Sequence, residues 1–296
     1  MEPSVQHDTV VVPPEPLALS APLARRLAAR CCRHVDHSGI GCRNYHGVWQ
    51  YLRLVDLVTT PRDHASFYVP VLLNALRSGR RRVLISGAVD YSMLAVVLAA
   101  CAAAGVAGDI TVADVCETPI RLCHWYADRM GAAIATEVTD ILEHKPTAPY
   151  DLIVTHSFLG AFPPASRTRL VSAWRDWLKP GGEIVTVNRI RPGAPQMVAF
   201  TDAETGKFRD SVRHAVAAHA GELDIDTEAL DALVQGYLAQ RAVYPIGSCE
   251  ELGSLFEAAG LRVTALSLEP LAASGLPSGP TLRGGAEYAK IVATRA

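Results

Sequence analysis

The sequence lacks an excess of charge of either sign. Its 28 lysine and arginine residues are balanced by 30 aspartate and glutamate residues, giving a formal net charge of −2. Binding to nucleic acid or to anionic lipid depends largely on clustered basic side chains that displace counterions. The one dense basic run, Arg77–Arg82, directly precedes an expected strand, and we interpret it as a solvated flank. We therefore expect neither nucleic acid nor a membrane among the partners.

The sequence also lacks a long hydrophobic run and a basic, then apolar, leader. Its longest apolar stretch, Ser92–Ala107, is shorter than the about 20 residues that a membrane-spanning helix needs. Residues 1–15 contain acids and prolines, unlike a secretory signal peptide, so we expect a cytoplasmic protein. With 296 residues, of which 49% are hydrophobic, the chain has enough material for one large domain with an appendage.

Cysteine spacing typical of zinc binding is absent. The seven cysteines are odd in number and scattered, apart from Cys31 and Cys32, and no CxxC pair occurs. His34 and His37 could share a helix face, but no further ligand pattern accompanies them. We therefore predict no disulfide framework and no metal site, and expect most cysteines to be small buried residues.

The N-terminal part of the sequence has a helical pattern. Leucine, valine and phenylalanine recur at steps of three and four residues from Ala18 to about Leu76. Residues 1–16, rich in proline and valine, are compatible with either an arm or a pairing strand. We assign residues 1–79 to an N-terminal arm and helical lid.

From Arg82 onward, short apolar runs alternate with helical patterns. The runs that we predict as strands are Val83–Gly87, Ile110–Asp114, Ala133–Val138, Tyr150–Thr155 and Glu183–Val187. The helical patterns between them are Met93–Ala104, Pro119–Met130 and Arg167–Trp177. This alternation predicts a parallel sheet covered by helices on both faces.

The C-terminal part departs from the alternation. Residues 204–241 read as a helical insertion, and Ser248–Ala259 as a helix with a serine N-cap and a glutamate three residues later. Leu261–Leu268 and Glu287–Thr294 are expected strands with no helix between them, which favours antiparallel pairing. Residues 80–296 should therefore form a doubly wound α/β sheet, mostly parallel, with an antiparallel C-terminal strand.

Four segments resemble class I S-adenosylmethionine-dependent methyltransferases, and the likeness extends from about Arg80 to the C-terminus. They are a glycine loop, VLISGAVDYSM; a second strand ending in an acid, ITVADVCETPI; a fourth strand, YDLIVTHSFLGAF; and the turn into a fifth, LKPGGEIVTVNRI. The resemblance implies a class I methyltransferase-like, Rossmann-like fold with S-adenosyl-L-methionine as cofactor. The family's loop usually has three glycines in a G-x-G-x-G pattern, whereas Gly87 stands alone here.

Ligands of open parallel sheets bind outside the carboxyl ends of the strands, so residues that follow each strand are the candidate cofactor contacts. They are Ser86, Gly87, Ala88 and Asp90, then Asp114 and Val115, then Asp140 and Ile141, and finally His156. Asp114 would accept the ribose hydroxyls, and the resemblance implies that Asp140 contacts the adenine amine. Asp90 would either hold the cofactor's ammonium group or cap the next helix, and both readings stay open.

Polar and aromatic side chains are dense in the N-terminal helices. The cluster includes Tyr45, His46, Trp49, Gln50, His64 and Phe67. In methyltransferases of this kind, such helices often cover the cofactor, and aromatic faces suit a cationic sulfonium. We therefore expect the last four to contact the substrate or close the lid, with core packing as the alternative for Trp49 and Phe67.

His156 is the best-placed candidate base, because a neutral imidazole can accept a proton near pH 7. Tyr45 and His46 are the other catalytic candidates. Ser157 or Phe158 could face the substrate instead, since adjacent strand residues alternate sides. Methyl transfer is an in-line displacement, so alignment of the acceptor contributes more than acid–base chemistry.

These patterns predict an S-adenosylmethionine-dependent methyltransferase that acts on a small molecule, with a homodimer as a possible assembly. The altered glycine loop motivates a second hypothesis, in which the cofactor's aminocarboxypropyl arm is transferred or cyclised, as in azetidine-2-carboxylate formation. A third hypothesis is a non-catalytic S-adenosylmethionine-binding protein, because a fold does not fix its chemistry.

Overall fold

The computed structural model describes residues 10–33, 41–219, 221, 223–240, 242–270, 279–280 and 287–296. The predictions for residues 1–9, for His34 and His37, and for most of the loop between the last two strands lie outside these ranges. No helix in the described part of the chain is both long and apolar enough to cross a bilayer.

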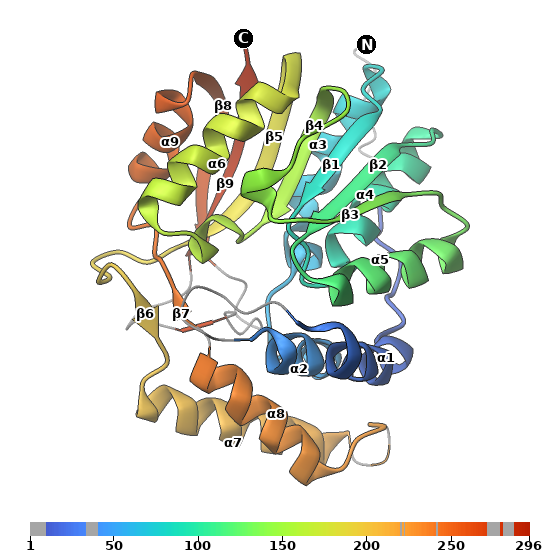
Figure 1. Ribbon diagram of the computed structural model, residues 1–296, viewed down its shortest axis with the longest axis vertical. Helices are drawn as coiled ribbons and strands as arrows, with labels where there is room; N and C mark the ends of the chain where they lie inside the picture. The colour runs from blue at the N-terminus through green and yellow to red at the C-terminus, as the bar shows by residue number, and fades with distance from the viewer. Residues whose placement is uncertain are drawn as a thin grey trace, which may run out of the picture.

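A seven-stranded sheet forms the centre of the molecule (Figure 1). Its strands, in spatial order, are β3 (Ala135–Val138), β2 (Asp109–Asp114), β1 (Arg82–Ser86), β4 (Tyr150–His156), β5 (Leu178–Ile190), β9 (Glu287–Arg295) and β8 (Leu261–Pro270). β9 pairs antiparallel with both β5 and β8, and the other pairings are parallel. The predicted sheet with an antiparallel C-terminal strand is therefore confirmed, and it has the strand arrangement of the class I methyltransferase fold.

Helices cover both faces of the sheet because the central strands are apolar on both sides. α3 (Ala65–Arg77), α4 (Ser92–Ala104) and α5 (Glu117–Met130) pack on one face. α6 (Pro164–Trp177) and α9 (Cys249–Ala258) pack on the other. The serine N-cap of α9 is as expected, with the Ser248 hydroxyl accepting the backbone N–H of Glu251.

α3 belongs to this sandwich and not to the lid in which the sequence analysis placed it. Tyr68 and Leu72 are fully buried in the same core as the apolar α4. The Tyr68 hydroxyl donates to the Thr155 carbonyl at 2.7 Å and accepts the Val187 N–H at 2.9 Å. A helix that bridges β4 and β5 in this way is part of the sheet domain.

A second, smaller layer covers the carboxyl ends of the parallel strands, and we call it the cap (Figure 1). It consists of α1 (Leu17–Cys31), α2 (Arg43–Leu54), α7 (Asp202–Ala218) and α8 (Thr227–Gln240), and it has its own apolar core. The predicted insertion is therefore two helices that pack beneath α2. Short strands β6 (Val198–Ala199) and β7 (Ala242–Val243) pair where the chain enters and leaves them.

One buried ion-pair network joins the cap to the loop after β1. Arg53 on α2 contacts Asp90 in that loop at 2.8 Å and Glu15, which precedes α1, at 2.5 Å. All three side chains are at most 3% exposed. Burial raises the pKa of Glu15, while Arg53 opposes that shift.

Replacing Arg53 with methionine should destabilise the protein by about 3–5 kcal/mol, because it leaves two buried carboxylates without their cation. Urea unfolding measures this change. The loss should grow with rising pH. Without Arg53, burial alone acts on the pKa of Glu15 and raises it further. A carboxyl group whose folded-state pKa is raised makes the folded state less stable as pH rises through that pKa. Arg213→Met, which removes an exposed pair with Asp210, is the control and should leave stability unchanged. A variant as stable as the parent would contradict the role given to Arg53.

Candidate functional site

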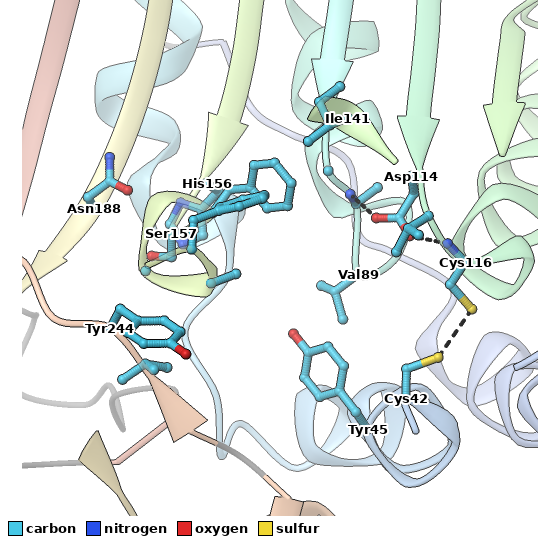
Figure 2. Close-up of a pocket in the computed structure, with 18 of the residues that line it drawn as sticks. Cys42, Tyr45, Val89, Asp114, Cys116, Ile141, His156, Ser157, Asn188 and Tyr244 are labelled. Carbon is cyan, nitrogen blue, oxygen red and sulfur yellow. Dashed lines mark hydrogen bonds between the residues drawn. The ribbon is translucent and has the colours of Figure 1, made fainter. Parts of the chain in front are cut away.

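A cavity of about 770 Å³ lies between the carboxyl ends of the strands and the cap (Figure 2). Residues after β1, β2, β4 and β5 line one side of it, and α2, α8 and the segment around Tyr244 line the other. β1 and β4 are neighbours in the sheet but not in the sequence, so the cavity opens where the strand order reverses. Open α/β sheets bind their ligands at this position.

Gly87 is the tightest point of the loop after β1. Its φ is +75°, and a Cβ built there would lie 2.4 Å from the ring of Phe158. A side chain at this position would therefore meet both an unfavourable backbone conformation and an aromatic ring. Phe158 thus packs on the single glycine of the loop, where the resemblance to class I methyltransferases implies further glycines.

Asp114 ends β2 with its carboxylate bound to two backbone amides. Ala88 donates to Oδ2 at 2.9 Å, and Cys116 donates to Oδ1 at 2.7 Å. Burial raises the pKa of Asp114 to about 6, although these amides and the nearby His46 oppose that shift. Asp114 and its neighbour Val115, two of the expected cofactor contacts, both line the cavity.

Asp140 and Ile141 follow β3 and also line the cavity. Asp140 accepts the backbone N–H of Leu142 at 2.9 Å and caps a short 3₁₀ helix, Ile141–Glu143. The apolar side chain of Ile141 is 4% exposed. The turn-forming role and a position beside the cavity therefore coexist at Asp140.

Asp90 is fully engaged inside the protein. Its Oδ1 accepts the Ser92 N–H at 2.6 Å at the start of α4, and its Oδ2 accepts from Gln50 and pairs with Arg53. Asp90 also lines the cavity, so a contact at the start of α4 and a position beside the cavity coexist at this residue. Gln50 itself lies in this buried network and does not line the cavity.

His156 lines the cavity at the end of β4, beside Ser157 and Phe158. Its Nδ1 lies 3.2 Å from the Tyr68 hydroxyl, and burial, aided by the nearby His64, holds its pKa well below the ordinary value. Ser157 has a φ of +50°, a conformation that non-glycine residues seldom adopt. Such strain next to a cavity is often part of a functional site.

Three further predicted contacts lie outside the cavity lining. Ser86 is buried and accepts the indole N–H of Trp174 at 3.1 Å. The His64 ring packs between His156 and Tyr288, and burial lowers its pKa to about 4. Phe67 lies on α3 and packs against the sheet domain.

The cap contributes an aromatic wall. Tyr45 stacks on Tyr237 with ring centroids 5.8 Å apart and contacts Trp49 at 5.3 Å. Figure 2 shows Tyr45 and Tyr244 reaching the cavity from the side opposite the strand ends. Tyr237 lies in the predicted insertion and Tyr244 shortly after it, and neither was among the predicted site residues.

The carboxyl end of β5 supplies polar residues that the sequence analysis also missed. Asn188, Arg189 and Arg191 line the cavity and are between 1% and 7% exposed. Two arginines within three residues at the end of an apolar strand were the available signal. The buried Oδ1 of Asn188 and the buried indole N–H of Trp49 have no hydrogen-bond partner among the described residues. Buried polar atoms are normally satisfied, so these two favour a polar ligand.

His46 lies among cysteines, at the edge of the cavity. Its Nδ1 is 3.3 Å from the Sγ of Cys32, which in turn is 3.6 Å from the Sγ of Cys116; Cys42 is 3.5 Å from Cys116. One potential ligand atom from each of the four residues lies within 4.8 Å of the others, and we call this group the CysHis cluster. Hydrogen bonds, first of all with Cys116, lower the pKa of the Cys32 thiol to about 3. The scattered spacing of the cysteines had predicted no such gathering.

Gly87→Ala should destabilise the protein more than Gly79→Ala does. Gly79 has a φ of +95° but nothing within 4 Å of a built Cβ, so its substitution reports backbone strain alone, about 1–2 kcal/mol. Gly87→Ala adds the collision with Phe158, for which overpacking predicts about 1–3 kcal/mol more. Urea unfolding of both variants tests this, and equal losses would show that the loop accommodates the methyl group.

Comparison with known proteins identifies no close relative. No protein-family model matches the sequence, and no curated protein matches it. Among solved structures, the N-methyltransferase NodS from Bradyrhizobium japonicum, with S-adenosylhomocysteine bound, is 15% identical over 77% of this chain and 85% of its own, with a TM-score of 0.46.

Two further solved structures match over most of this chain. The methyltransferase SibL is 16% identical over 95% of this chain and 70% of its own, with a TM-score of 0.47. The Synechocystis magnesium protoporphyrin IX methyltransferase, with S-adenosylmethionine bound, is 8% identical over 94% of this chain and 92% of its own, with a TM-score of 0.46. The sheet order itself, with β9 reversed between β5 and β8, gives this chain the class I methyltransferase fold.

Proposed function

We propose that this protein binds S-adenosylmethionine in the cavity and transfers its methyl group to a small molecule. One observation carries the proposal: Gly87, Asp114 and Ile141 line a single cavity at the reversal point of the sheet. Its volume of about 770 Å³ is toward the upper end of the range of about 300–1,000 Å³ for small-molecule sites, so a cofactor and an acceptor can share it.

The residues present fit the cofactor's adenosine. Asp114 would accept the ribose hydroxyls, and its bonds to two amides fix the carboxylate in place. Asp140 and Ile141 would flank the adenine, one as a hydrogen-bond acceptor and the other as an apolar surface. When bound, the cofactor supplies an electrophilic methyl group on a positively charged sulfur.

The methionine arm would lie near Gly87, and an acceptor other than the expected Asp90 would hold its ammonium group. The Asp90 carboxylate already binds Arg53, Gln50 and the Ser92 amide. The unpartnered Asn188 Oδ1 is an acceptor suited to an ammonium group, and it faces the same cavity. We assign the ammonium to Asn188.

The acceptor would lie between β5 and the cap. Arg189 and Arg191 bring two buried guanidinium groups to this side of the cavity, where a low dielectric strengthens their attraction for anions. Tyr244 and Met197 add apolar surface. We therefore propose an acceptor that combines an apolar body with a carboxylate or another anionic group.

His156 would orient the acceptor's nucleophilic atom or take its proton. Because burial holds its pKa well below the ordinary value, the imidazole is neutral at pH 7 and is available as an acceptor. The Tyr68 hydroxyl near Nδ1 fixes the ring orientation. The aromatic wall of the cap would exclude water and align the acceptor with the methyl group.

The decisive experiment incubates the purified protein with S-adenosylmethionine, with and without panels of carboxylate-bearing acceptors, and identifies the nucleoside formed. S-adenosylhomocysteine that appears only with an acceptor supports methyl transfer. Methylthioadenosine without any acceptor would instead support loss or cyclisation of the aminocarboxypropyl arm. Binding without turnover across the panel would favour the non-catalytic reading.

Asp114→Asn should weaken S-adenosylmethionine binding by about 1.5–3 kcal/mol, the contribution of hydrogen bonds to a charged acceptor. In the parent protein, affinity should fall between pH 7 and pH 5, because the carboxyl group becomes protonated as pH falls through its pKa of about 6. The variant should lack this pH dependence. Calorimetric titration measures both effects. Asp109→Asn, at the exposed start of β2, is the matched control, and an Asp114 variant that behaves like it would remove Asp114 from the site.

His156→Phe should lower turnover by about 10²–10⁴-fold if proton removal accompanies transfer, with little change in cofactor affinity. The parent's rate should show no inflection near pH 6.5 from this group, because its pKa lies well below that value. His64→Phe, which changes a neighbouring ring outside the cavity lining, is the control. Rates are expressed per cofactor-binding site, and undiminished turnover in the His156 variant would exclude it as base.

A further inference from the structure

We propose that the CysHis cluster binds one zinc ion that joins the cap to the sheet domain. The cluster holds three cysteine sulfurs and one histidine nitrogen within 4.8 Å of one another. Three cysteines and one histidine form one of the common ligand sets of structural zinc sites. The inference is independent of the proposed reaction, because it concerns metal binding alone.

The observed separations fit tetrahedral coordination. With Zn–S bonds of about 2.3 Å and a Zn–N bond of about 2.0–2.1 Å, ideal angles place two sulfurs about 3.8 Å apart and a sulfur and nitrogen about 3.5 Å apart. The two Sγ–Sγ distances to Cys116 are 3.5 and 3.6 Å, and Cys32 Sγ lies 3.3 Å from the His46 ring nitrogen. The ligand atoms therefore need only small shifts to surround an ion.

The backbone brings these residues together at three helix ends. Cys32 is the C-cap of α1, Cys42 is the N-cap of α2, and Cys116 is the N-cap of α5. His46 follows Cys42 by four residues, so both lie on one face of the first turn of α2. Neither Cys42 nor Cys116 makes the side-chain capping bond that serine or aspartate would supply there. Cysteine at two N-caps therefore calls for another explanation, and metal ligation provides one.

The surroundings favour the thiolate form that zinc requires. Two helix N-termini, those of α2 and α5, point their positive ends toward the sulfurs. The Thr118 hydroxyl lies 3.2 Å from Cys32 Sγ and can donate to a thiolate, as outer-shell groups do at metal sites. Four protein ligands leave no open position for a substrate, which is typical of a structural site and not of a catalytic one.

The metal ion would hold the cap against the sheet domain at the edge of the cavity. Cys32, Cys42 and His46 belong to the cap, whereas Cys116 lies two residues after Asp114 and donates its amide to that carboxylate. His46 would then be a zinc ligand and not a catalytic group, which changes the role expected for it from the sequence. Zinc would also replace a loose cluster of thiols, which are prone to oxidation when they are exposed and ionised.

The test measures zinc in the full-length protein, purified without a metal-binding tag under reducing conditions, by inductively coupled plasma emission. About one equivalent per chain is expected. After exchange for Co²⁺, thiolate-to-cobalt charge-transfer bands and intense visible bands of a tetrahedral site should appear. These two measurements need no variant, so a poorly folding mutant cannot obscure the answer.

Variants then assign the ligands. Cys42→Ser and Cys116→Ser should each lower zinc affinity at least tenfold in competition with a chromogenic chelator, and His46→Ala should do the same. Cys31→Ser is the matched control, because this residue adjoins Cys32 but lies outside the cluster, and it should retain one equivalent. Equal zinc binding in all four variants would overturn the assignment.

Two results for the parent protein would overturn the proposal altogether. One is less than a tenth of an equivalent of zinc after anaerobic reconstitution with zinc salt. The other is a mass lighter by two hydrogens together with absent zinc, which would identify a disulfide pair instead. Because none of these readouts involves S-adenosylmethionine, failure of the zinc site and failure of the proposed methyl transfer are separate outcomes.

Discussion

The buried pairing of Arg53 with Glu15 and Asp90 determines how the cap sits on the sheet domain. A guanidinium group taken out of water must keep its carboxylate partners, since breaking a buried pair leaves an uncompensated charge. Here the partners come from the segment before α1 and from the loop after β1, so the network links three parts of the chain. The loop after β1, which lines the cavity, is thereby held by the cap through Asp90.

The cavity follows from this arrangement. Residues at the carboxyl ends of β1, β2, β4 and β5 line one side of the cavity, and aromatic rings from α2 and α8 line the other. Side chains of α7 and α8 pack with those of α2 in one apolar core, so the insertion stabilises the cap. Charged and polar groups are divided between the two sides: acids follow β2 and β3, and arginines follow β5. The two sides of the cavity therefore differ in charge.

Local sequence patterns predicted the sheet well and the site partly. The apolar runs of the central strands, the Ser248–Glu251 cap and the placement of Asp114 depend on residues that are near one another in the sequence. The position of α3, the engagement of Asp90 and the CysHis cluster depend on contacts between segments that are distant in the sequence. The number of residues between Cys32 and Cys116 predicts nothing about their contact, because the two helix ends that carry them meet only in the folded protein. Arg189 and Arg191 were missed because the predicted contacts follow only the first four strands. Basic residues that end an apolar strand are nevertheless unusual.

Cys116 shows how closely the cap and the cofactor side of the cavity are joined. Its amide holds Oδ1 of Asp114, while its sulfur contacts Cys32 and Cys42 from the cap. The Asp114 carboxylate in turn accepts the backbone N–H of Ala88. Ala88 lies in the glycine loop after β1, between Gly87 and Asp90. A movement that separates the cap from the sheet must therefore disturb either the Arg53 network at one end of this loop or the sulfur contacts beside Asp114. Separation of the cap from the sheet and reorientation of the Asp114 carboxylate are then parts of one structural change, because the same few residues make both sets of contacts.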